Sequence, residues 1–396
     1  MTVPHGRPVL PGADLAEEHQ VLRATVRKFA QTEVAPRAAG IDREDEFPHD
    51  LYGKLADLGL LGLTTPEQYG GQGADEVSMC IALEELARAS GTVANACLLA
   101  KLQSEFICRA GTEEQRNRYV PDIAAGRRIC LIAVTEPDAG SDVAAISTRA
   151  RREGDHWVLD GTKAFMTAGA VGDLAVVLAS TDPAAGPKGL TAFLVPKSPD
   201  GDSTKGFVAD HKEELLGMRG LATAGISLGG TVVHDDNVLG ELGRGLTVAL
   251  RSFSNGRIVI ASLALGLAVG ALDAAVGYVT QRQAFGQKVS DFQGVQFMLA
   301  DARVAIEASR LLIHRAAALK DRGESFATEA SEAKLFASDT AMRVATDALQ
   351  LHGGYGYTKD AVVERIFRDA KLTQIYEGTN QIQRVIIARD LLKSAR

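Results

Sequence analysis

Hydrophobic residues recur at helical spacing through roughly the first 125 positions of the chain. Leu51, Leu55 and Leu58 share one helical face, and Gly59 follows them as a terminating residue. Similar apolar spacing returns several times in the segments that follow. This pattern predicts an N-terminal α-helical domain over residues 1–125.

Short β-rich runs replace the helical pattern between positions 129 and 239. Trp157 to Leu159 forms one such run, and Asp160-Gly161 follows it as a turn signal before the run from Lys163 to Thr167. Further apolar and β-branched runs alternate with glycine and proline. We therefore predict a small middle β domain over residues 126–239.

Long helical patterns return after position 245. They cover Leu246 to Ala284, Phe292 to Arg322 and Ala327 to Leu351, with short connections between them. Short connections favour antiparallel neighbours, so the pattern predicts a helical bundle over residues 240–396. The apolar stretch from Ile258 to Ala275 continues into a polar helix, which favours a buried bundle helix over a membrane span.

The bulk properties argue against several classes of protein. The 396 residues carry a formal net charge of -7, and no basic stripe favours nucleic acid. The cysteines lack C-x-x-C spacing and the histidines lack the H-E-x-x-H motif, so no metal site is predicted. Few cysteines in a large chain fit a reducing compartment. Met1 to Gly12 lacks the apolar core of a signal peptide, so we expect a loose tail on a cytoplasmic protein without membrane partners.

The most informative candidate site is the segment Tyr376-Glu377-Gly378-Thr379, directly before a helical pattern from Asn380 to Lys393. Thr379 can cap that helix through its hydroxyl, and Gly378 lets another molecule approach the backbone closely. A carboxylate held at such a junction can act as a positioned base. The plainer interpretation is an acidic residue that the helix dipole favours.

Three other segments carry polar or glycine-rich chemistry, and each is weak alone. The loop from Thr135 to Ser141 offers backbone N–H groups and hydroxyls to a polar ring or phosphate, or it is an ordinary turn. Arg282 has two interpretations: a guanidinium that binds a phosphate, or a solvated cation at a helix end. The Gly353-Gly354 pair permits close approach of a cofactor or is a plain helix cap.

Two familiar motifs are set aside. Gly225 to Gly229 matches the hydrolase pattern G-x-S-x-G, but that elbow requires a strand, a sharp turn and then a helix. Here the β pattern continues through Gly230 to Val233, which argues against an esterase. No G-x-G-x-x-G leads from a strand into a helix, so a Rossmann nucleotide site is not predicted.

The order of these segments resembles the acyl-CoA dehydrogenase family over essentially the whole chain. Helices are followed by Val134-Thr135-Glu136-Pro137 with Gly140-Ser141-Asp142, a β region, Arg282 to Gly286, Gly353-Gly354, and Tyr376 to Gln383. The stretch from Ser254 to Arg396 is most similar to the short-chain branch. The resemblance implies a mainly α fold with an N-terminal helical domain, a middle β-barrel-like domain and a C-terminal four-helix bundle.

The resemblance also implies a reaction and its partners. The family uses FAD to convert a saturated acyl-CoA to the trans-2-enoyl-CoA, as in fatty acid β-oxidation. Glu377 matches the base that removes the α-proton while the β-hydride moves to flavin N5. Electrons then pass to an electron-transferring flavoprotein, and the family is mostly homotetrameric, as a dimer of dimers. Some branches carry the base immediately before the arginine matched by Arg257; Gly256 stands there, which is consistent with Glu377.

The remaining site residues are implied by the same resemblance. The cofactor-binding positions are Ile132, Val134, Thr135, Ser141, Phe165, Met166, Thr167, Arg282, Phe292, Gln293, Gln350, Gly353, Gly354, Thr379, Asn380 and Gln381. Of these, Arg282, Phe292 and Gln293 match positions that reach the FAD of a neighbouring subunit. The substrate-binding positions are Ser141, Ser254, Arg257 and Gly378. Phe165 stands where the family often has tryptophan, and Ala284 where it often has a polar residue.

Other functions stay open on the residues alone. A flavin monooxygenase or a nitroalkane-type oxidase shares the scaffold, but the first tends to lose the base and the second carries Asp, so Glu377 favours the dehydrogenase. A non-catalytic CoA-ligand binding scaffold would purify as a colourless protein. Fold alone does not decide among them. For the substrate we expect a short or medium acyl-CoA on the resemblance.

Overall fold

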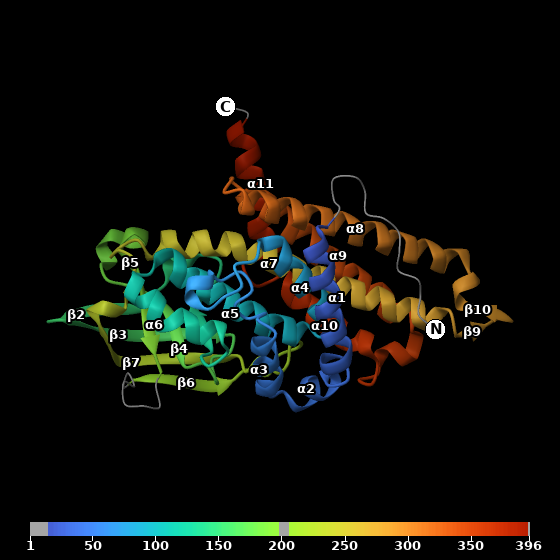
Figure 1. Cartoon of the computed structure of the whole chain (residues 1–396), viewed down its shortest axis with the longest axis horizontal. Coiled ribbons are helices and arrows are strands. Elements are labelled where there is room, and N and C mark those ends of the chain that lie inside the picture. Colours follow the sequence, from blue (N-terminus) through green and yellow to red (C-terminus); the bar gives the residue numbers. More distant parts are fainter. Residues whose placement is uncertain (1–14, 198–205, 395–396) are drawn as a thin grey trace.

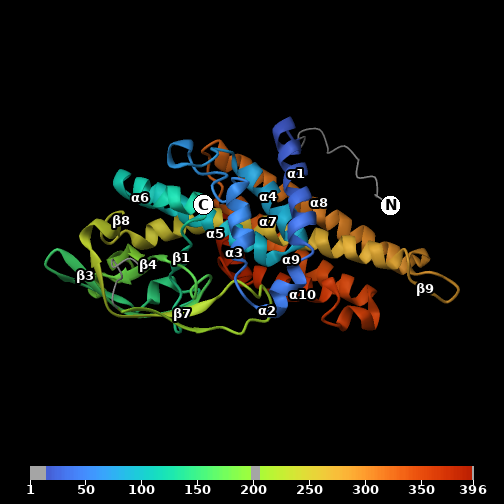
Figure 2. The same cartoon turned by 60° about the horizontal axis from the view of Figure 1, so that its bottom comes forward.

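The computed structural model describes residues 15–197 and 206–394. The predicted tail from Met1 to Gly12 lies outside these residues. The longest helices run along the long axis of the molecule, and a β-sheet packs against one end of them (Figure 1). The small hairpin of β9 (Gln283–Ala284) and β10 (Gln287–Lys288) lies at the opposite end in both views (Figures 1 and 2).

The predicted N-terminal helices are confirmed. They are α1 Glu17–Phe29, α2 Ala38–Glu44, α3 His49–Asp57, α4 Glu76–Ala89, α5 Gly91–Ala110 and α6 Glu113–Ala124. Ser90 ends α4 and also caps α5, because its hydroxyl accepts a hydrogen bond from the backbone N–H of Val93. Both α4 and α5 are buried along most of their length, so they form the part of this region that meets the rest of the molecule.

The middle of the chain forms a mixed sheet. Its strands are β1 Cys130–Ala133, β2 Arg149–Glu153, β3 His156–Met166, β4 Leu174–Ser180, β5 Leu190–Pro196, β6 Phe207–Lys212, β7 Ala224–His234 and β8 Val238–Leu239. The strand order is β6-β7-β3-β2-β4-β5-β8, and β1 pairs in parallel with β4. Because β4 and β5 are buried at every position, they form the centre of this sheet's packing.

The turn predicted at Asp160-Gly161 is wrong. Strand β3 runs through both residues and pairs with β7 on either side, with a register shift between Leu159 and Gly161. A Cβ on Gly161 would lie 2.4 Å from the Thr148 hydroxyl oxygen. The glycine therefore makes a β-bulge where β3 passes close to Thr148, the residue before β2, rather than a hairpin turn. Strand β7 passes straight through Gly225 to Gly229, which confirms that this motif is no hydrolase elbow.

The C-terminal part is a bundle of helices. They are α7 Gly245–Val279, α8 Gln293–Asp321, α9 Ala327–Leu351, α10 Val362–Thr373 and α11 Asn380–Ser394. The first helix stops at Val279, before the predicted Ala284, because Gln283 and Ala284 pair with the residues beyond Gly286. Positive φ angles at Phe285 (51°) and Gly286 (79°) make the turn of this hairpin.

Helix α7 is the centre of the molecule. It packs against α4, α5, α8, α9 and α10. Its length and apolar composition would allow it to cross a membrane, but 78% of its most apolar window is buried inside the fold. The prediction of a buried bundle helix is therefore confirmed. As domain boundaries we propose residues 125/126, between α6 and β1, and 239/240, between β8 and α7.

Candidate active site

Glu377 lies in the short connection between α10 and α11. Its φ angle is 52°, and that of Gly378 is 88°, so two consecutive residues adopt the left-handed conformation. A non-glycine residue in this region costs on the order of 1 kcal/mol and persists only where its surroundings hold it. The strained backbone turns the Glu377 side chain toward α7.

Contacts with α7 show where the carboxylate points. A Cβ placed on Gly256 would lie 2.5 Å from Glu377 Oε2, so only a glycine leaves room for the carboxylate here. The next residue, Arg257, is buried, and its Nε has no hydrogen-bond partner among the described residues. One Arg257 Nη approaches the Ser254 hydroxyl at 3.4 Å. Glu377, Arg257 and Ser254 thus converge on one face of α7.

The carboxylate of Glu377 is partly buried and is not tied to a donor. Burial raises the pKa of Glu377 to about 7, while the positive charges of Arg257 and Lys334 act in the opposite direction. No donor among the described residues hydrogen-bonds to the carboxylate. A carboxyl group that titrates near neutral pH and keeps its lone pairs free has the properties of a general base.

The backbone around Glu377 is held from two helices. The Gly378 carbonyl accepts hydrogen bonds from Gln383 Nε2 at 2.7 Å and from Lys334 Nζ at 2.8 Å. The Thr379 hydroxyl accepts from the backbone N–H of Ile382 at 3.4 Å, so the predicted cap of α11 is confirmed. These contacts fix the turn from both α9 and α11.

Residues on α5 complete the surroundings. Asn95 Nδ2 donates to the Tyr376 hydroxyl at 3.4 Å. Asn255, which precedes Gly256, donates through Nδ2 to Glu105. Glu105 belongs to a buried group of charged residues that lines a hollow of about 260 Å³ and includes Glu76, Lys101 and Lys320. Helices α5 and α7 are therefore joined by polar contacts next to the candidate base.

One group of predicted cofactor residues lies on the sheet. The backbone N–H of Ala164 donates to the Thr135 carbonyl at 2.9 Å, which joins the loop after β1 to the end of β3. Phe165 has φ 60° and is 61% exposed, an unusual position for a large apolar ring. Thr167 and Ile132 are partly buried, Ser141 is exposed, and Val134 and Met166 are buried. The sheet thus presents an exposed aromatic ring.

A second group lies at the far end of the bundle. The Arg282 guanidinium lies 5.9 Å from the centre of the Tyr355 ring, and the rings of Phe285 and Phe292 meet edge to face at 6.2 Å. Arg282, Gln293, Gln350, Gly353 and Gly354 are all exposed. The β9–β10 hairpin and the sheet stand at opposite ends of the molecule (Figures 1 and 2). One chain therefore does not bring these two groups together.

The chemistry of both groups fits a flavin dinucleotide. The exposed Phe165 ring and the hydroxyls of Thr135, Ser141 and Thr167 suit an aromatic ring system with polar edges. The exposed Arg282 suits a phosphate. Thr379, Asn380 and Gln381 begin α11, next to Glu377. Asn380, however, is buried against α9, where its amide bonds to Ser338 and Asp339.

Sequence reasoning missed Lys334. This lysine stands on the buried face of α9 in line with Ala330, Ala337 and Ala341, and its side chain is fully buried. A single lysine within a stripe of small apolar residues at helical spacing is the signal that would have found it.

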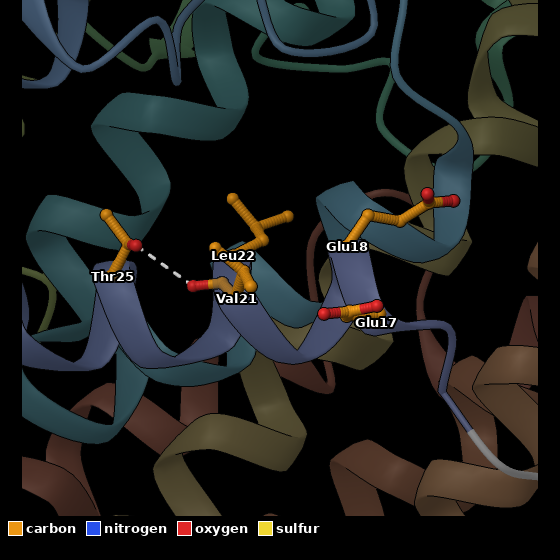
Figure 3. A pocket seen from close by; sticks show the side chains of 5 residues that line it. All are labelled: Glu17, Glu18, Val21, Leu22 and Thr25. Carbon is orange, nitrogen blue, oxygen red and sulfur yellow. Dashed lines mark hydrogen bonds between the residues drawn. The ribbon is translucent and has the colours of Figure 1, made fainter.

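A larger surface hollow lies elsewhere. It has a volume of about 590 Å³ and runs along α1, where Glu17, Glu18, Val21, Leu22 and Thr25 line it (Figure 3). The Thr25 hydroxyl donates to the Val21 carbonyl at 2.9 Å within the same helix. This hollow contains none of the candidate site residues.

Comparison with known proteins gives a consistent result along the chain. Residues 16–127, 131–230 and 243–392 match the N-terminal, middle and C-terminal domains of acyl-CoA dehydrogenase. The chain is 43% identical over 391 residues to the probable acyl-CoA dehydrogenase FadE25 of Mycobacterium tuberculosis, covering 98% of this chain and 99% of that one.

Two solved structures share the fold. One is a chain from a structure of the electron transferring flavoprotein of Acidaminococcus fermentans, with a TM-score of 0.93 and 40% identity. The other is butyryl-CoA dehydrogenase from Megasphaera elsdenii, with a TM-score of 0.92 and 37% identity. In both cases the match covers 96% of this chain and 99% of the other.

A helical fold with a β-sheet from the middle of the chain, a flavin-compatible surface and an unpaired carboxylate defines a flavoprotein oxidoreductase. The chain belongs to the acyl-CoA dehydrogenase family, and its cofactor is FAD.

Proposed function

We propose that the protein removes hydrogen from the α and β carbons of a saturated acyl-CoA thioester, giving the trans-2-enoyl-CoA, with Glu377 as the base. The observation that carries this proposal is the Glu377 carboxylate. It is unpaired, it lies against Gly256, and its pKa is raised to about 7. At neutral pH a substantial fraction of such a group is ionised and ready to accept a proton.

The reaction divides into a proton and a hydride. Glu377 takes the α-proton onto its carboxylate, and a carbon–carbon double bond forms as the β-hydrogen leaves with its electron pair. FAD, when bound, accepts that hydride. The Glu377 backbone N–H makes no hydrogen bond within the described residues, so it is available to donate to the thioester carbonyl as negative charge develops there. Burial of the site strengthens both interactions.

The residues that would hold substrate and cofactor are those that the family resemblance implies. We propose that Ser254, Arg257 and Gly378 contact the acyl-CoA together with Ser141 on the sheet. For FAD we propose the sheet residues around Thr135, the residues Thr379 and Gln381 at the start of α11, and the distant group around Arg282. Butyryl-CoA dehydrogenase is among the similar structures, which supports a short acyl chain as the substrate.

The separation of the two cofactor groups supports a second copy of the chain. The Arg282 group and the sheet lie at opposite ends of one chain, so we propose that each FAD is bound by residues of two subunits in a homotetramer. Helix α8 also exposes Phe297, Val304 and Leu311 at a spacing of seven residues, an apolar stripe suited to another subunit. Sedimentation of the holoenzyme tests this assembly.

We further propose an electron-transferring flavoprotein as the electron acceptor and the cytoplasm as the location. The electron transferring flavoprotein structure that contains a similar chain supports the acceptor. Reduction of a purified electron-transferring flavoprotein in the presence of acyl-CoA tests the partner, and fractionation of source cells tests the location.

Anaerobic mixing of the holoenzyme with saturated acyl-CoAs tests the reaction itself. We expect the yellow flavin absorbance to bleach with butyryl-CoA and more weakly with long-chain acyl-CoAs. Absence of bleaching with every straight and branched acyl-CoA would contradict the proposal and favour an oxidase or monooxygenase on this fold. A colourless purified protein would favour a non-catalytic ligand-binding scaffold instead.

A further inference from the structure

Lys334 is a buried lysine whose hydrogen bonds go to the segment that carries Glu377. Its Nζ donates to the Gly378 carbonyl at 2.8 Å and to the Asn380 side-chain oxygen at 2.9 Å. Both acceptors are neutral groups. A lysine in a fully buried position on neutral acceptors is energetically unfavourable whenever it is protonated, so its presence calls for a reason beyond packing.

The turn that Lys334 contacts needs an outside restraint. Glu377 and Gly378 are both left-handed, and a strained pair of this kind relaxes unless other groups hold it. Lys334 bonds to Gly378 inside the turn and to Asn380 just after it, so one side chain bridges the bend. Asn380 is itself anchored, because its Nδ2 donates to Asp339 at 2.7 Å and to Ser338 at 2.9 Å.

Lys334 also acts on Glu377 through its charge. The charged groups that face Glu377 are Arg257 on α7 and Lys334 on α9, and both favour the ionised carboxylate. Those that face Lys334 are Glu377, Asp339 and Arg257. Burial lowers the pKa of Lys334 to about 7, and the two carboxylates oppose this change.

We propose that Lys334 is a positioning residue for the dehydrogenation: its side-chain nitrogen holds, through hydrogen bonds to Gly378 and Asn380, the left-handed turn on which Glu377 stands, and its protonated form favours the ionised state of that carboxylate. The inference rests on the proposed function of Glu377 as the base. Lys334 touches neither substrate nor cofactor in this account. It acts through the backbone of Gly378 and through its electric field.

The variant Lys334→Met removes the hydrogen bonds and the charge while keeping most of the apolar stem. In the holoenzyme we expect kcat with butyryl-CoA to fall about 30-fold and KM to change less than about threefold, because the base is displaced. The acid limb of the pH profile of kcat/KM should move upward by about one unit, because the carboxylate loses a nearby cation.

Gln383→Leu is the matched variant. Gln383 is also fully buried and donates to the same Gly378 carbonyl, but it carries no charge. We expect kcat to fall in this variant without any movement of the acid limb. Lys54→Met, which removes an exposed lysine on α3, should leave both quantities unchanged.

The inference is overturned if Lys334→Met keeps kcat within about threefold of the wild type and keeps the wild-type acid limb. Glu377→Gln separates this failure from failure of the proposed function. If Glu377→Gln retains full activity, the base assignment itself falls; if only Lys334→Met behaves as wild type, the base assignment stands. If Lys334→Met does not fold with FAD, Lys334→Gln replaces it, because the glutamine keeps a hydrogen-bond donor but carries no charge. An acid limb of kcat/KM that does not move in Lys334→Gln would overturn the inference.

Discussion

Buried Glu136 and partly buried Glu377 each lie near a buried lysine, and the hydrogen bonds of that lysine differ between the two sites. In the sheet region, Lys163 Nζ donates directly to Glu136 Oε1 at 2.8 Å, and the backbone N–H groups of Ser147 and Thr148 donate to the same carboxylate. In the bundle, Lys334 lies near Glu377 but donates to the neighbouring carbonyl of Gly378 instead. The lysine bonds the carboxylate in one case and the backbone in the other.

The difference separates a structural carboxylate from a reactive one. Burial acts to raise the pKa of both glutamates, but hydrogen bonds from Lys163 and the backbone overcome it and lower the pKa of Glu136 to about 2. Glu377 has no such donors, and its pKa is raised to about 7. The pKa of Lys163 is lowered by burial but stays at about 8, so the Glu136–Lys163 pair is ionised at neutral pH. A glutamate in a buried setting stays available as a base where the neighbouring hydrogen-bond donors bond to backbone carbonyls instead of to its carboxylate.

The largest effect is expected from removing the reactive carboxylate. Glu377→Gln should lower kcat on the order of 10³-fold, because the amide cannot accept the α-proton. The flavin spectrum and the affinity for acyl-CoA should be retained, since the side chain keeps its shape. Steady-state kinetics and a ligand titration measure the two quantities. Activity near the wild-type level would mean that another group is the base.

The next effect concerns the structural pair. Lys163→Met should destabilise the fold by about 3 kcal/mol, because Glu136 is left buried without its charged partner. Urea unfolding of the holoenzyme measures this change. Arg151→Met removes an exposed ion pair with Glu153 on β2 and serves as the control, with an expected change below about 0.5 kcal/mol. Equal destabilisation by the two substitutions would remove the distinction between the two glutamates.

These two glutamates also show how far the sequence alone reaches. The cap by Thr379 follows from a local residue pattern, and the structure agrees with it, whereas Gly256 was singled out by the family resemblance and lies beside Glu377 in the structure. Lys334 was not predicted, because it lies far from Glu377 in sequence and meets it only through the packing of α9 against α11. Local patterns carry no information about such a tertiary contact.

The errors in the fold have a similar cause. Asp160-Gly161 has the composition of a turn, but β3 pairs with β7 through these residues, and they form a bulge within the strand. Helix α7 ends before Ala284 because the β9–β10 pairing competes with helix continuation. In both places a hydrogen-bonded partner strand decides the structure, and the residue pattern does not identify that partner.

A smaller effect is expected from crowding the reactive carboxylate. Gly256→Ala places a Cβ 2.5 Å from the present position of Glu377 Oε2, so the flexible end of the glutamate must move aside. We expect kcat to fall about tenfold with FAD binding retained. Gly277→Ala on the same helix is the control, because its Cβ would meet no atom within 4 Å. Unchanged kcat in Gly256→Ala would place the working position of the carboxylate elsewhere.

The smallest effect is on stability. Because the pKa of Glu377 is raised from 4.5 to about 7 on folding, the native state binds more protons between these values. The stability contributed by this group is therefore present at low pH and is lost as the pH rises toward 7. Glu377→Gln removes the cost of holding this carboxylate ionised, so the variant should be more stable than the wild type at pH 8 and gain nothing near pH 4. Thermal unfolding at both pH values checks the sign.

The ionisation of Glu377 is the property on which the contrast with Glu136 depends, and infrared spectroscopy observes it directly. A difference spectrum between the wild type and Glu377→Gln, titrated with pH, isolates the carboxyl band of this one residue. We predict that the band of the protonated acid disappears with a midpoint near pH 7. A midpoint at or below the ordinary glutamate value of 4.5 would contradict the account.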